Sequence, residues 1–409
     1  MNVAIVGGGA SGVFCAIELK RRLPSAQITI YESNSKILAK LEITGGGRCN
    51  LTNSSLSELG DIERISPKEL ERFYPRGASL MKRALASLSQ RQTMQWFENE
   101  GVKLTIQEDG CVFPASQNAM EIVSMFKRRL KELDIKVVCN KKIEKIEALQ
   151  EDIIVITAGG QPSPSGFAML QTTKYKDIEI VPPCPSLFTF NIDCAPLKRL
   201  AGCVVEAAAV SLASTRFTSN GALLITDWGV SGPAILKLSS YASRYLKEKS
   251  YQAELIINWL GADYSSASKI LKGHIESSSA KKLLNIPLRG LTGRLWELIV
   301  SRSGIREDIT AAEIGTKGFN RLVNTLINDT YPITGKGRFK DEFVTCGGVA
   351  IKEIALATMQ CKRYPNLYFA GEIIDIDAIT GGYNLQAAWS TGYTVARSIA
   401  LNNTLTQQA

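Results

Sequence analysis

The chain has 409 residues, of which 45% are hydrophobic and 21% are charged, so it can bury a sizeable core. At about 100–200 residues per domain, this length predicts two or three domains. Because no run approaches the roughly 18 consecutive apolar residues of a membrane-spanning helix, we expect no membrane partner. No secretory signal precedes the first predicted strand, which favours a cytoplasmic protein.

The cysteine and histidine content excludes several kinds of site. Nine cysteines are scattered without a CxxC pair, a distribution more typical of reduced thiols than of a disulfide framework or a zinc site. The only histidine, His274, lies away from every motif, where a surface position is the simplest interpretation. A multi-histidine metal centre is therefore excluded, and we predict no metal.

The chain is basic, with 48 lysines and arginines against 39 aspartates and glutamates and a net charge of +9. Such an excess favours polyanionic partners in a general way. Basic residues gather at 294–306 and 336–340; the second stretch could bind an anion, although a basic hairpin turn is the simpler interpretation. A solvated surface and the phosphates of a bound cofactor explain the charge more simply than nucleic acid does.

The opening residues predict a strand, a tight glycine turn, a helix and a second strand. Residues 2–6 are apolar and β-branched, residues 13–22 have apolar positions at helical spacing, and residues 27–31 again favour a strand. The turn between the first strand and the helix has the pattern GxGxxG over residues 7–12. This arrangement is one βαβ unit with parallel strands.

The glycine turn indicates a site for a dinucleotide. Gly7 permits the tight turn, Gly9 lets a pyrophosphate approach the backbone, and Gly12 lets the helix pack on the strand. The N–H groups at the start of the helix, including those of Ala10 and Ser11, then face the phosphates. Glu32 ends the second strand twenty residues after Gly12, where its carboxylate can bind a ribose 2′-OH.

A second glycine-rich loop, residues 43–53, allows a flat ring or a phosphate to lie against the backbone. Gly45 and Gly46 precede Arg48, which supplies a counter-charge, and Asn50, which supplies an amide. Cys49 could be a redox thiol that faces the ring, but no resolving cysteine is near it in sequence, so we favour a packing role.

The middle of the chain alternates between helical and strand-like patterns. Helices are expected at 67–73, 79–100, 119–133 and 233–246, and again over 262–328, where Thr310 and Glu313 form a capping box. Strands are expected at 136–138, 152–157, 187–192, 204–212, 222–226 and 254–259. Five prolines between residues 162 and 185 mark a break in organisation.

The last motif lies near the C-terminus. Residues 366–370 predict a strand that ends in Gly371 and Glu372, and an acid at the end of a strand can hold polyol hydroxyls. Residues 381–386, with Gly382, Tyr383, Asn384 and Gln386, open a final helix whose N-terminus can stabilise negative charge on a reduced ring.

These three motifs, in this order, resemble one family, the BaiN/RdsA-type (YhiN-like) NAD(P)/FAD-dependent oxidoreductases, a branch of the glutathione-reductase-like FAD proteins. The segments 45–53 and 371–386 carry most of the likeness, and shorter matches occur at 112–116, 229–234 and 345–349. The resemblance implies an α/β fold: a Rossmann-type FAD-binding domain (1–185 and 343–409), an inserted β-barrel-like domain (186–260 and 330–342) and a small helical subdomain (261–329).

The resemblance also implies a set of residues that contact FAD. It places the ribose on Glu32, the pyrophosphate on the glycine turn, and the ring against the second glycine loop and the turn at 382–384. The turn at Ala158 and Gly159 closes the site, and Asp375 belongs to the same motif as Glu372. Lys40 could approach the phosphates, although a solvated lysine is equally compatible with the sequence.

Two departures from the family affect the chemistry. The family usually has Thr-His before Gly-x-Ser-Gly-Pro, whereas this chain has Asp227 after Thr226, and the glycine-rich stretch after the closing turn is shortened to 161–166. Any role of an imidazole is therefore lost or passes to Asp227. Our candidates for proton handling are Asp227 and Tyr383.

We therefore expect an FAD-dependent oxidoreductase that acts on a small-molecule substrate, with NADH or NADPH as a transient electron donor, since no second GxGxxG offers a separate nicotinamide domain. An RNA-modifying flavoprotein and an FAD-binding protein without turnover are the alternatives. The sequence sets neither the substrate nor the oligomeric state.

Overall fold

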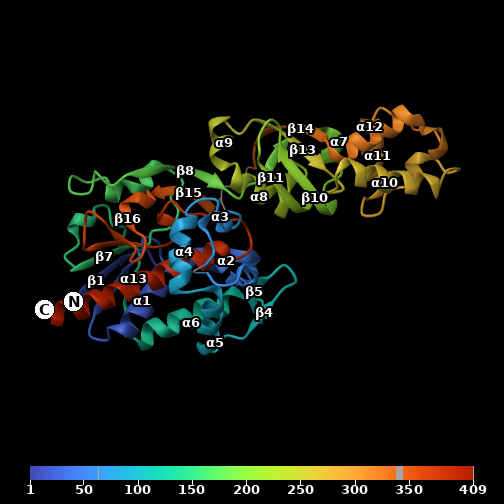
Figure 1. Cartoon of the computed structure of the whole chain (residues 1–409). Helices are drawn as coiled ribbons and strands as arrows, with labels where there is room; N and C mark the ends of the chain where they lie inside the picture. Colours follow the sequence, from blue (N-terminus) through green and yellow to red (C-terminus); the bar gives the residue numbers. More distant parts are fainter. Residues whose placement is uncertain (63, 338–343, 409) are drawn as a thin grey trace. The chain divides into compact units, whose positions relative to one another are not determined.

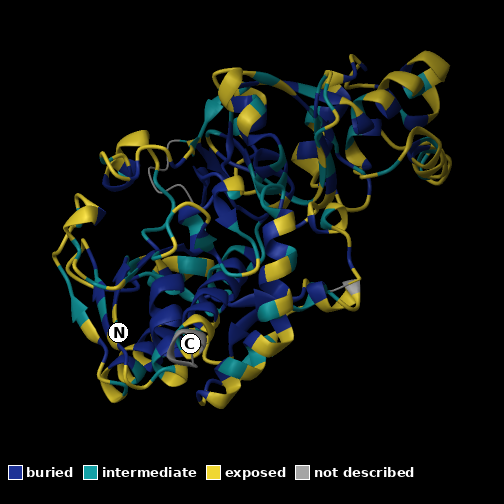
Figure 2. Cartoon of the chain, turned by 60° about the vertical axis from the view of Figure 1, so that its left-hand side comes forward, coloured by how far each residue is buried: buried dark blue, intermediate teal, exposed yellow. Residues whose placement is uncertain are grey.

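The computed structural model describes residues 1–62, 64–337 and 344–408, and the chain divides into two compact units (Figure 1). The first unit combines Met1–Pro185 with Val344–Ala409, and the second comprises Ser186–Phe343. In the first unit most strand residues are buried, whereas the strands of the second unit alternate buried residues with partly buried or exposed ones (Figure 2). The predicted anion-binding stretch 336–340 lies largely outside the described residues.

The core of the first unit is a seven-stranded sheet in the order β16-β17-β18-β7-β1-β2-β6. The five strands from β18 to β6 are parallel, and β16 and β17 are antiparallel additions at one edge. Parallel strands buried on both faces read as apolar runs, as in β1, β2 and β7. Their bounds are β1 Asn2–Val6, β2 Gln27–Tyr31, β6 Lys136–Val138, β7 Ile153–Ile156, β16 Ile354–Ala355, β17 Gln360–Cys361 and β18 Leu367–Phe369.

Two helices from opposite ends of the chain pack together beside this sheet: α1 (Ala10–Arg22) and α13 (Tyr383–Gln408) (Figure 1). The other helices of the unit are α2 Ala39–Gly47, α3 Pro67–Leu70, α4 Ala78–Ser87, α5 Gln90–Asn99 and α6 Ala119–Glu132. A small sheet joins β3 (Thr52–Asn53), β5 (Cys111–Pro114) and β4 (Leu104–Ile106).

Three predicted segments differ from the structure for local reasons. The helix expected over 79–100 is two helices, because Ser89 caps α5 through a reciprocal capping box with Gln92. The expected loop 43–53 begins inside α2, whose backbone leaves helical geometry at Thr44, and ends in strand β3. The helix expected over 233–246 is likewise divided at Ala242.

The second unit is built on a closed antiparallel barrel in the order β10-β11-β12-β9-β14-β13. Its strands are β9 Phe190–Ile192, β10 Val204–Leu212, β11 Thr218–Ile225, β12 Gly229–Ser231, β13 Ala253–Asn258 and β14 Asp329–Lys336. Helices α7 (Ala195–Lys198), α8 (Pro233–Tyr241) and α9 (Ser243–Glu248) accompany it. Helices α10 (Tyr264–Glu276), α11 (Gly293–Arg302) and α12 (Gly315–Ile327) form a helical group inserted between β13 and β14.

The chain leaves the first unit through one strand and returns to it through another, and these two strands pair with each other. They are β8 (Ile180–Ser186) and β15 (Val344–Val349), which form a sheet of their own. The prolines in residues 180–186 predict a break in the chain, so the sequence analysis missed β8.

Candidate FAD and active site

The predicted cofactor motifs meet at one edge of the large sheet. Strands β2, β1, β7 and β18 are parallel neighbours, so their carboxyl ends all lie at this edge. Glu32 follows β2, the glycine turn follows β1, residues 157–160 follow β7, and Gly371 follows β18. In open α/β sheets, ligands bind in the crevice at these carboxyl ends.

The glycine turn is packed tightly at two positions and open at the third. Gly7 has a φ of +114°, and a Cβ there would lie 2.4 Å from the carbonyl oxygen of Thr157. A Cβ on Gly12 would lie 2.1 Å from the carbonyl oxygen of Gly7. A Cβ on Gly9 would meet no described atom within 4 Å. The turn therefore needs Gly7 and Gly12 for its own packing, whereas Gly9 leaves space over the start of α1.

The start of α1 can accept an anion. Its N-cap is Gly9, no side chain of the described residues caps it, and its first turn contains no acidic residue. The unpaired N–H groups and the positive end of the helix dipole therefore face the space beside Gly9. Ser11, 6% exposed, has a hydroxyl with no hydrogen-bond partner among the described residues.

Glu32 links the end of β2 to the glycine turn through hydrogen bonds. Its Oε2 accepts a hydrogen bond from the N–H of Gly8 at 2.8 Å. Its Oε1 accepts from the backbone and side-chain N–H groups of Asn34, each at 2.8 Å. The carboxylate is thus fixed in place at the end of β2, within the same edge of the sheet as the start of α1.

The turn after β7 and the acid after β18 lie together. A Cβ on Gly160 would lie 2.7 Å from the carboxyl carbon of Glu372, and Gly159 has a φ of +75° with open space beside it. Glu372 accepts from the N–H of Thr345 at 2.9 Å and pairs with Lys40 at 2.9 Å. Lys40 is thus bonded to a candidate cofactor residue, and its partly exposed ammonium borders the site.

The second glycine loop keeps its backbone exposed. Gly45 and Gly46 are exposed and have φ of 58° and 69°, values that favour glycine. Arg48 folds back over this loop: its Nε donates to the carbonyl oxygen of Gly45 at 3.1 Å, and its guanidinium lies 4.3 Å from the ring centre of Phe113. The loop therefore offers a flat, side-chain-free surface beside a cation.

This loop contacts the C-terminal glycine turn directly, although more than 320 residues separate them in sequence. A Cβ on Gly382 would lie 2.5 Å from the carbonyl oxygen of Thr52. The Nδ2 of Asn53 donates to the carbonyl oxygen of Gly381 at 3.0 Å. With its amide in the orientation that satisfies both ends, Asn50 accepts from the N–H of Gly382 at 3.2 Å. The two motifs form one surface.

Other predicted residues hold this surface from behind. Asn384 exchanges two hydrogen bonds with the backbone of Ala378, at 2.9 and 3.0 Å. Gly371 donates to the hydroxyl of Thr391, and Asp375 accepts from the N–H of Gly347. Gln386 is fully buried, so we assign it a positioning role rather than a contact with the cofactor; its partners are Thr52, Leu88, Thr93 and Ser390.

Cys49 is enclosed by the loop. The residue is fully buried, and burial raises the pKa of its thiol to about 12, against a smaller lowering effect from the hydroxyl of Thr44. A thiol with this pKa stays protonated at neutral pH and is a poor redox nucleophile. These observations favour the packing role over the redox role.

The raised pKa of Cys49 predicts a dependence of stability on alkaline pH. Above pH 9 the unfolded chain releases this proton while the folded chain keeps it, so the free energy of unfolding falls as pH rises, by about 1.4 kcal/mol per pH unit up to the folded-state pKa. Between pH 8 and 10.5, the free energy of unfolding of the Cys49→Ala apoprotein, measured by urea titration, should therefore fall by about 2 kcal/mol less than that of the wild-type apoprotein. An equal fall in the free energy of unfolding in both proteins would contradict the raised pKa of Cys49.

Tyr383 is 5% exposed and stacks near Phe73, with ring centres 4.9 Å apart. Burial raises the pKa of its phenol, and a hydrogen bond with Ser55 opposes the shift. Tyr383 is thus neutral and enclosed in the first unit.

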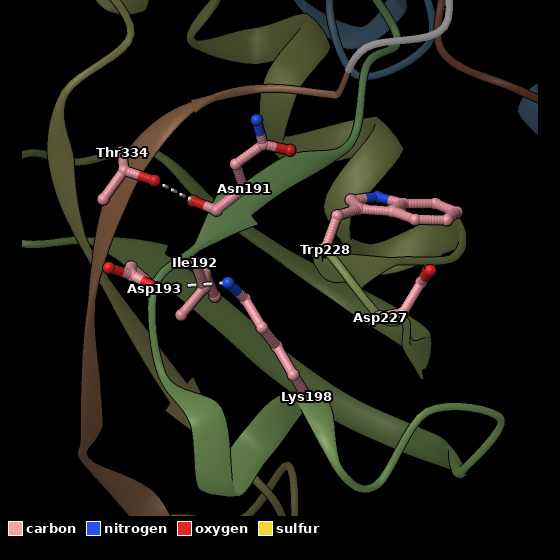
Figure 3. Close-up of a pocket in the computed structure, with 7 residues that line it drawn as sticks. All are labelled: Asn191, Ile192, Asp193, Lys198, Asp227, Trp228 and Thr334. Atoms are coloured by element: carbon pink, nitrogen blue, oxygen red, sulfur yellow. Dashed lines mark hydrogen bonds and ion pairs between the residues drawn. The ribbon is translucent and has the colours of Figure 1, made fainter.

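Asp227 lies on the barrel of the second unit and is exposed. It lines a cavity of about 550 Å³ together with Trp228, Asn191, Ile192, Asp193, Lys198 and Thr334. Figure 3 shows the indole of Trp228 beside Asp227, and Lys198 reaching to Asp193, with 3.2 Å between the charged atoms. The cavity combines an aromatic face with a carboxylate, a lysine and an amide.

Sequence reasoning missed several contributors. The hydroxyl of Thr157 donates to the carbonyl oxygen of Gly7 at 2.8 Å and so locks the turn, and Thr52 donates to Gln386 at 2.6 Å. Thr157 ends an apolar strand pattern, which is the one signal that could have indicated it. His274 is half-buried rather than on the surface, and its Nε2 lies 2.8 Å from the carbonyl oxygen of Ile286.

The arrangement fits FAD in the first unit. Space beside Gly9, an uncapped helix start, a fixed carboxylate and a side-chain-free loop occur at one edge of the sheet. Within residues 1–62, 64–337 and 344–408, no group of three or more His, Cys, Asp and Glu side chains could hold a metal ion. Across the same residues, no helix is both long and apolar enough to cross a membrane.

The parallel sheet, the glycine turn and the inserted six-stranded barrel define a flavoprotein with a Rossmann-type FAD-binding fold. A family model described as the HI0933-like protein Rossmann domain matches residues 1–398, and the chain belongs to this family of FAD-dependent oxidoreductases. The predicted fold class and the predicted enzyme class are thereby confirmed.

Two relatives and one solved structure indicate the range of similar proteins. A 3-dehydro-bile acid delta(4,6)-reductase from Clostridium scindens is 25% identical over 425 residues, covering 98% of this chain and 99% of that protein. A ribosomal RNA dihydrouridine synthase from Haemophilus influenzae is 28% identical over 418 residues, covering 97% and 98%. The 3-ketosteroid delta1-dehydrogenase from Sterolibacterium denitrificans has a TM-score of 0.50 at 11% identity, with 98% and 99% coverage, which shows the fold alone.

Proposed function

We propose that this chain is an FAD-dependent reductase that reduces a C=C bond conjugated to a carbonyl group. The observation that carries the proposal is the single surface formed by the second glycine loop and the turn at Gly382, which can lie against a flat ring beside a thiol that stays protonated. The names of both relatives support it, because a delta(4,6)-reductase and a dihydrouridine synthase both reduce such a bond.

Different residues would bind different parts of the cofactor. FAD, when bound, supplies the hydride chemistry, with NADH or NADPH as the donor. The N–H groups of Ala10, Ser11 and Gly12 hold the pyrophosphate, and Glu32 holds the ribose. Glu372, fixed by Lys40 and by the N–H of Thr345, holds the polyol.

The ring is held by backbone rather than by reactive side chains. Gly45, Gly46 and Gly382 leave space for it, and Asn50 fixes the two glycine segments to each other. Arg48 supplies positive charge beside the loop. These residues would hold the flavin ring and leave its chemistry to the cofactor, because none of them is a thiol or another redox-active group.

The test is an anaerobic titration in two steps. Protein loaded with FAD is mixed with NADPH or NADH, and loss of the visible flavin bands identifies the donor. The reduced protein is then mixed with a conjugated enone, such as a 3-oxo-4-ene steroid, and the bands should return in step with loss of the double bond. Return of the bands only when oxygen is admitted, with no double bond reduced in the enone or in the uridines of an added RNA, would contradict the proposal.

A uridine within RNA is a second candidate for the conjugated bond. Residues 186–343 carry 20 lysines and arginines against 14 aspartates and glutamates, so this unit holds most of the net positive charge. RNA binding of this origin weakens steeply with salt. If RNA is the substrate, reduced protein should form dihydrouridine in a ribosomal RNA transcript, measured by mass spectrometry, and should leave the enone unchanged.

Asp227 is proposed as the proton-handling group of the barrel cavity. General acid–base residues contribute about 10²–10⁴-fold, so Asp227→Asn should lower turnover by about 100-fold and alter its pH profile. Asp193→Asn is the matched control, because this aspartate lines the same cavity but is paired with Lys198. Unchanged turnover and an unchanged pH profile in Asp227→Asn would remove it from the mechanism and leave Tyr383 as the candidate.

A further inference from the structure

Two thiols lie against each other where β8 and β15 pair. The Sγ atoms of Cys184 and Cys346 are 2.9 Å apart, and the two residues are 2% and 0% exposed. A disulfide needs about 2.05 Å between the sulfur atoms, so a shift of roughly 1 Å would bring them to bonding distance. Neither cysteine is part of a disulfide in the structure.

The pair occupies the two places where the chain crosses between its units. The first unit ends its N-terminal part at Pro185, one residue after Cys184, and resumes at Val344, two residues before Cys346. A bond between the two sulfur atoms would close a loop with a sequence separation of 162 residues. Cross-links that close long loops restrict the unfolded chain strongly.

The strand pair at this position is poor in hydrogen-bond donors. β8 contains Pro182, Pro183 and Pro185, none of which has an N–H to donate to β15. The strands nevertheless approach closely, since a Cβ on Gly347 would lie 2.7 Å from the carbonyl oxygen of Pro182. The prolines limit the hydrogen bonds that β8 can donate, and local opening of such a strand would admit a small oxidant.

A buried cation lies close to the sulfur atoms. Burial lowers the pKa of Arg76, but its ion pair with Asp377 raises this pKa above the ordinary arginine value. The thiols of Cys346 and Cys184 also raise it. The two thiols thus lie near a buried guanidinium that is itself paired with Asp377.

We propose that Cys184 and Cys346 are a redox-active pair that a peroxide converts reversibly into a disulfide linking β8 to β15. One thiolate attacks hydrogen peroxide, the O–O bond breaks, hydroxide leaves and a sulfenic acid forms. The second thiol attacks that sulfur, the S–O bond breaks and water leaves. In total, two thiols are oxidised and one peroxide is reduced to two waters. A dithiol reductant restores both thiols.

The test counts thiols in denatured protein after exposure of the folded, reduced protein to hydrogen peroxide. The wild type should fall from nine thiols to seven, and dithiothreitol should restore nine. Cys184→Ser and Cys346→Ser, with eight thiols each, should form no disulfide: the variant that keeps the attacking cysteine should fall to seven thiols as its sulfenic acid forms, and the other should keep eight. The matched control is Cys361→Ser, which removes another buried thiol of the first unit and should fall from eight to six.

Peptide mapping of the wild type keeps the proposal testable if a serine variant does not fold. The peptide that contains Cys184 should be joined to the peptide that contains Cys346, and the oxidised protein should melt at a higher temperature than the reduced protein. Retention of nine thiols, thiol loss that dithiothreitol does not reverse, or a disulfide between other cysteines would each overturn the proposal.

Discussion

Gly9→Val is expected to abolish FAD binding while it leaves the apoprotein folded. A Cβ at this position meets no described atom within 4 Å, and the φ of −81° suits any residue, so the side chain fits the apoprotein. Only the loss of a glycine N-cap acts on stability, a cost of about 1 kcal/mol or less. The new side chain would fill the space beside the start of α1, which the pyrophosphate needs.

The measurement is FAD affinity by fluorescence titration, combined with urea unfolding of the apoprotein. We expect affinity to fall by at least about 100-fold, since the close approach of backbone to phosphate is lost. Gly12→Ala is the matched control within the same motif: its Cβ would lie 2.1 Å from the carbonyl oxygen of Gly7, so it should destabilise the apoprotein itself. Wild-type affinity in Gly9→Val would place the pyrophosphate elsewhere.

Arg76→Met is expected to lower the free energy of unfolding by about 3–5 kcal/mol. Arg76 and Asp377 form an ion pair through two bonds, and their side chains are 11% and 0% exposed. Removal of the guanidinium leaves a carboxylate buried without its main countercharge. Asp377 lies four residues before Gly381, so the loss also loosens the turn that contacts the second glycine loop.

The control for this prediction is Arg64→Met. The pair of Arg64 with Asp61 spans 3.5 Å, and its side chains are 88% and 54% exposed, so its removal should cost less than about 1 kcal/mol. Replacing both members of the buried pair, as Arg76→Met with Asp377→Leu, should recover part of the lost stability because neither charge of the pair is then left buried without the other. A loss below 1 kcal/mol in Arg76→Met alone would refute the role of the pair.

Local features of this chain could be read from its sequence because neighbouring residues determine them. The glycine turn, the helix after it and Glu32 lie within 26 residues, and each has a steric or hydrogen-bonding reason to be there. Strand β10 was predicted at its observed bounds because its pattern is long and bordered by clear turns. The capping box at Thr310 was also confirmed, since Glu313 accepts from its N–H and its hydroxyl.

Features that depend on distant segments could not be derived in this way. Nothing in either glycine motif alone indicates that Gly382 lies against Thr52; only the resemblance to a family brought them together. Burial of Gln386 results from packing by several elements, so sequence reasoning could not distinguish a supporting residue from one that contacts the cofactor. Strand β8 was missed because its pairing with β15 compensates for prolines that disfavour a strand.

The most direct test of the central claim is the visible absorption spectrum of the purified protein after incubation with FAD and removal of the free cofactor. We predict flavin bands at close to one FAD per chain, in wild-type protein and in Asp227→Asn, because Asp227 lies outside the first unit. A colourless protein that cannot be reconstituted with FAD, although folded, would contradict the account.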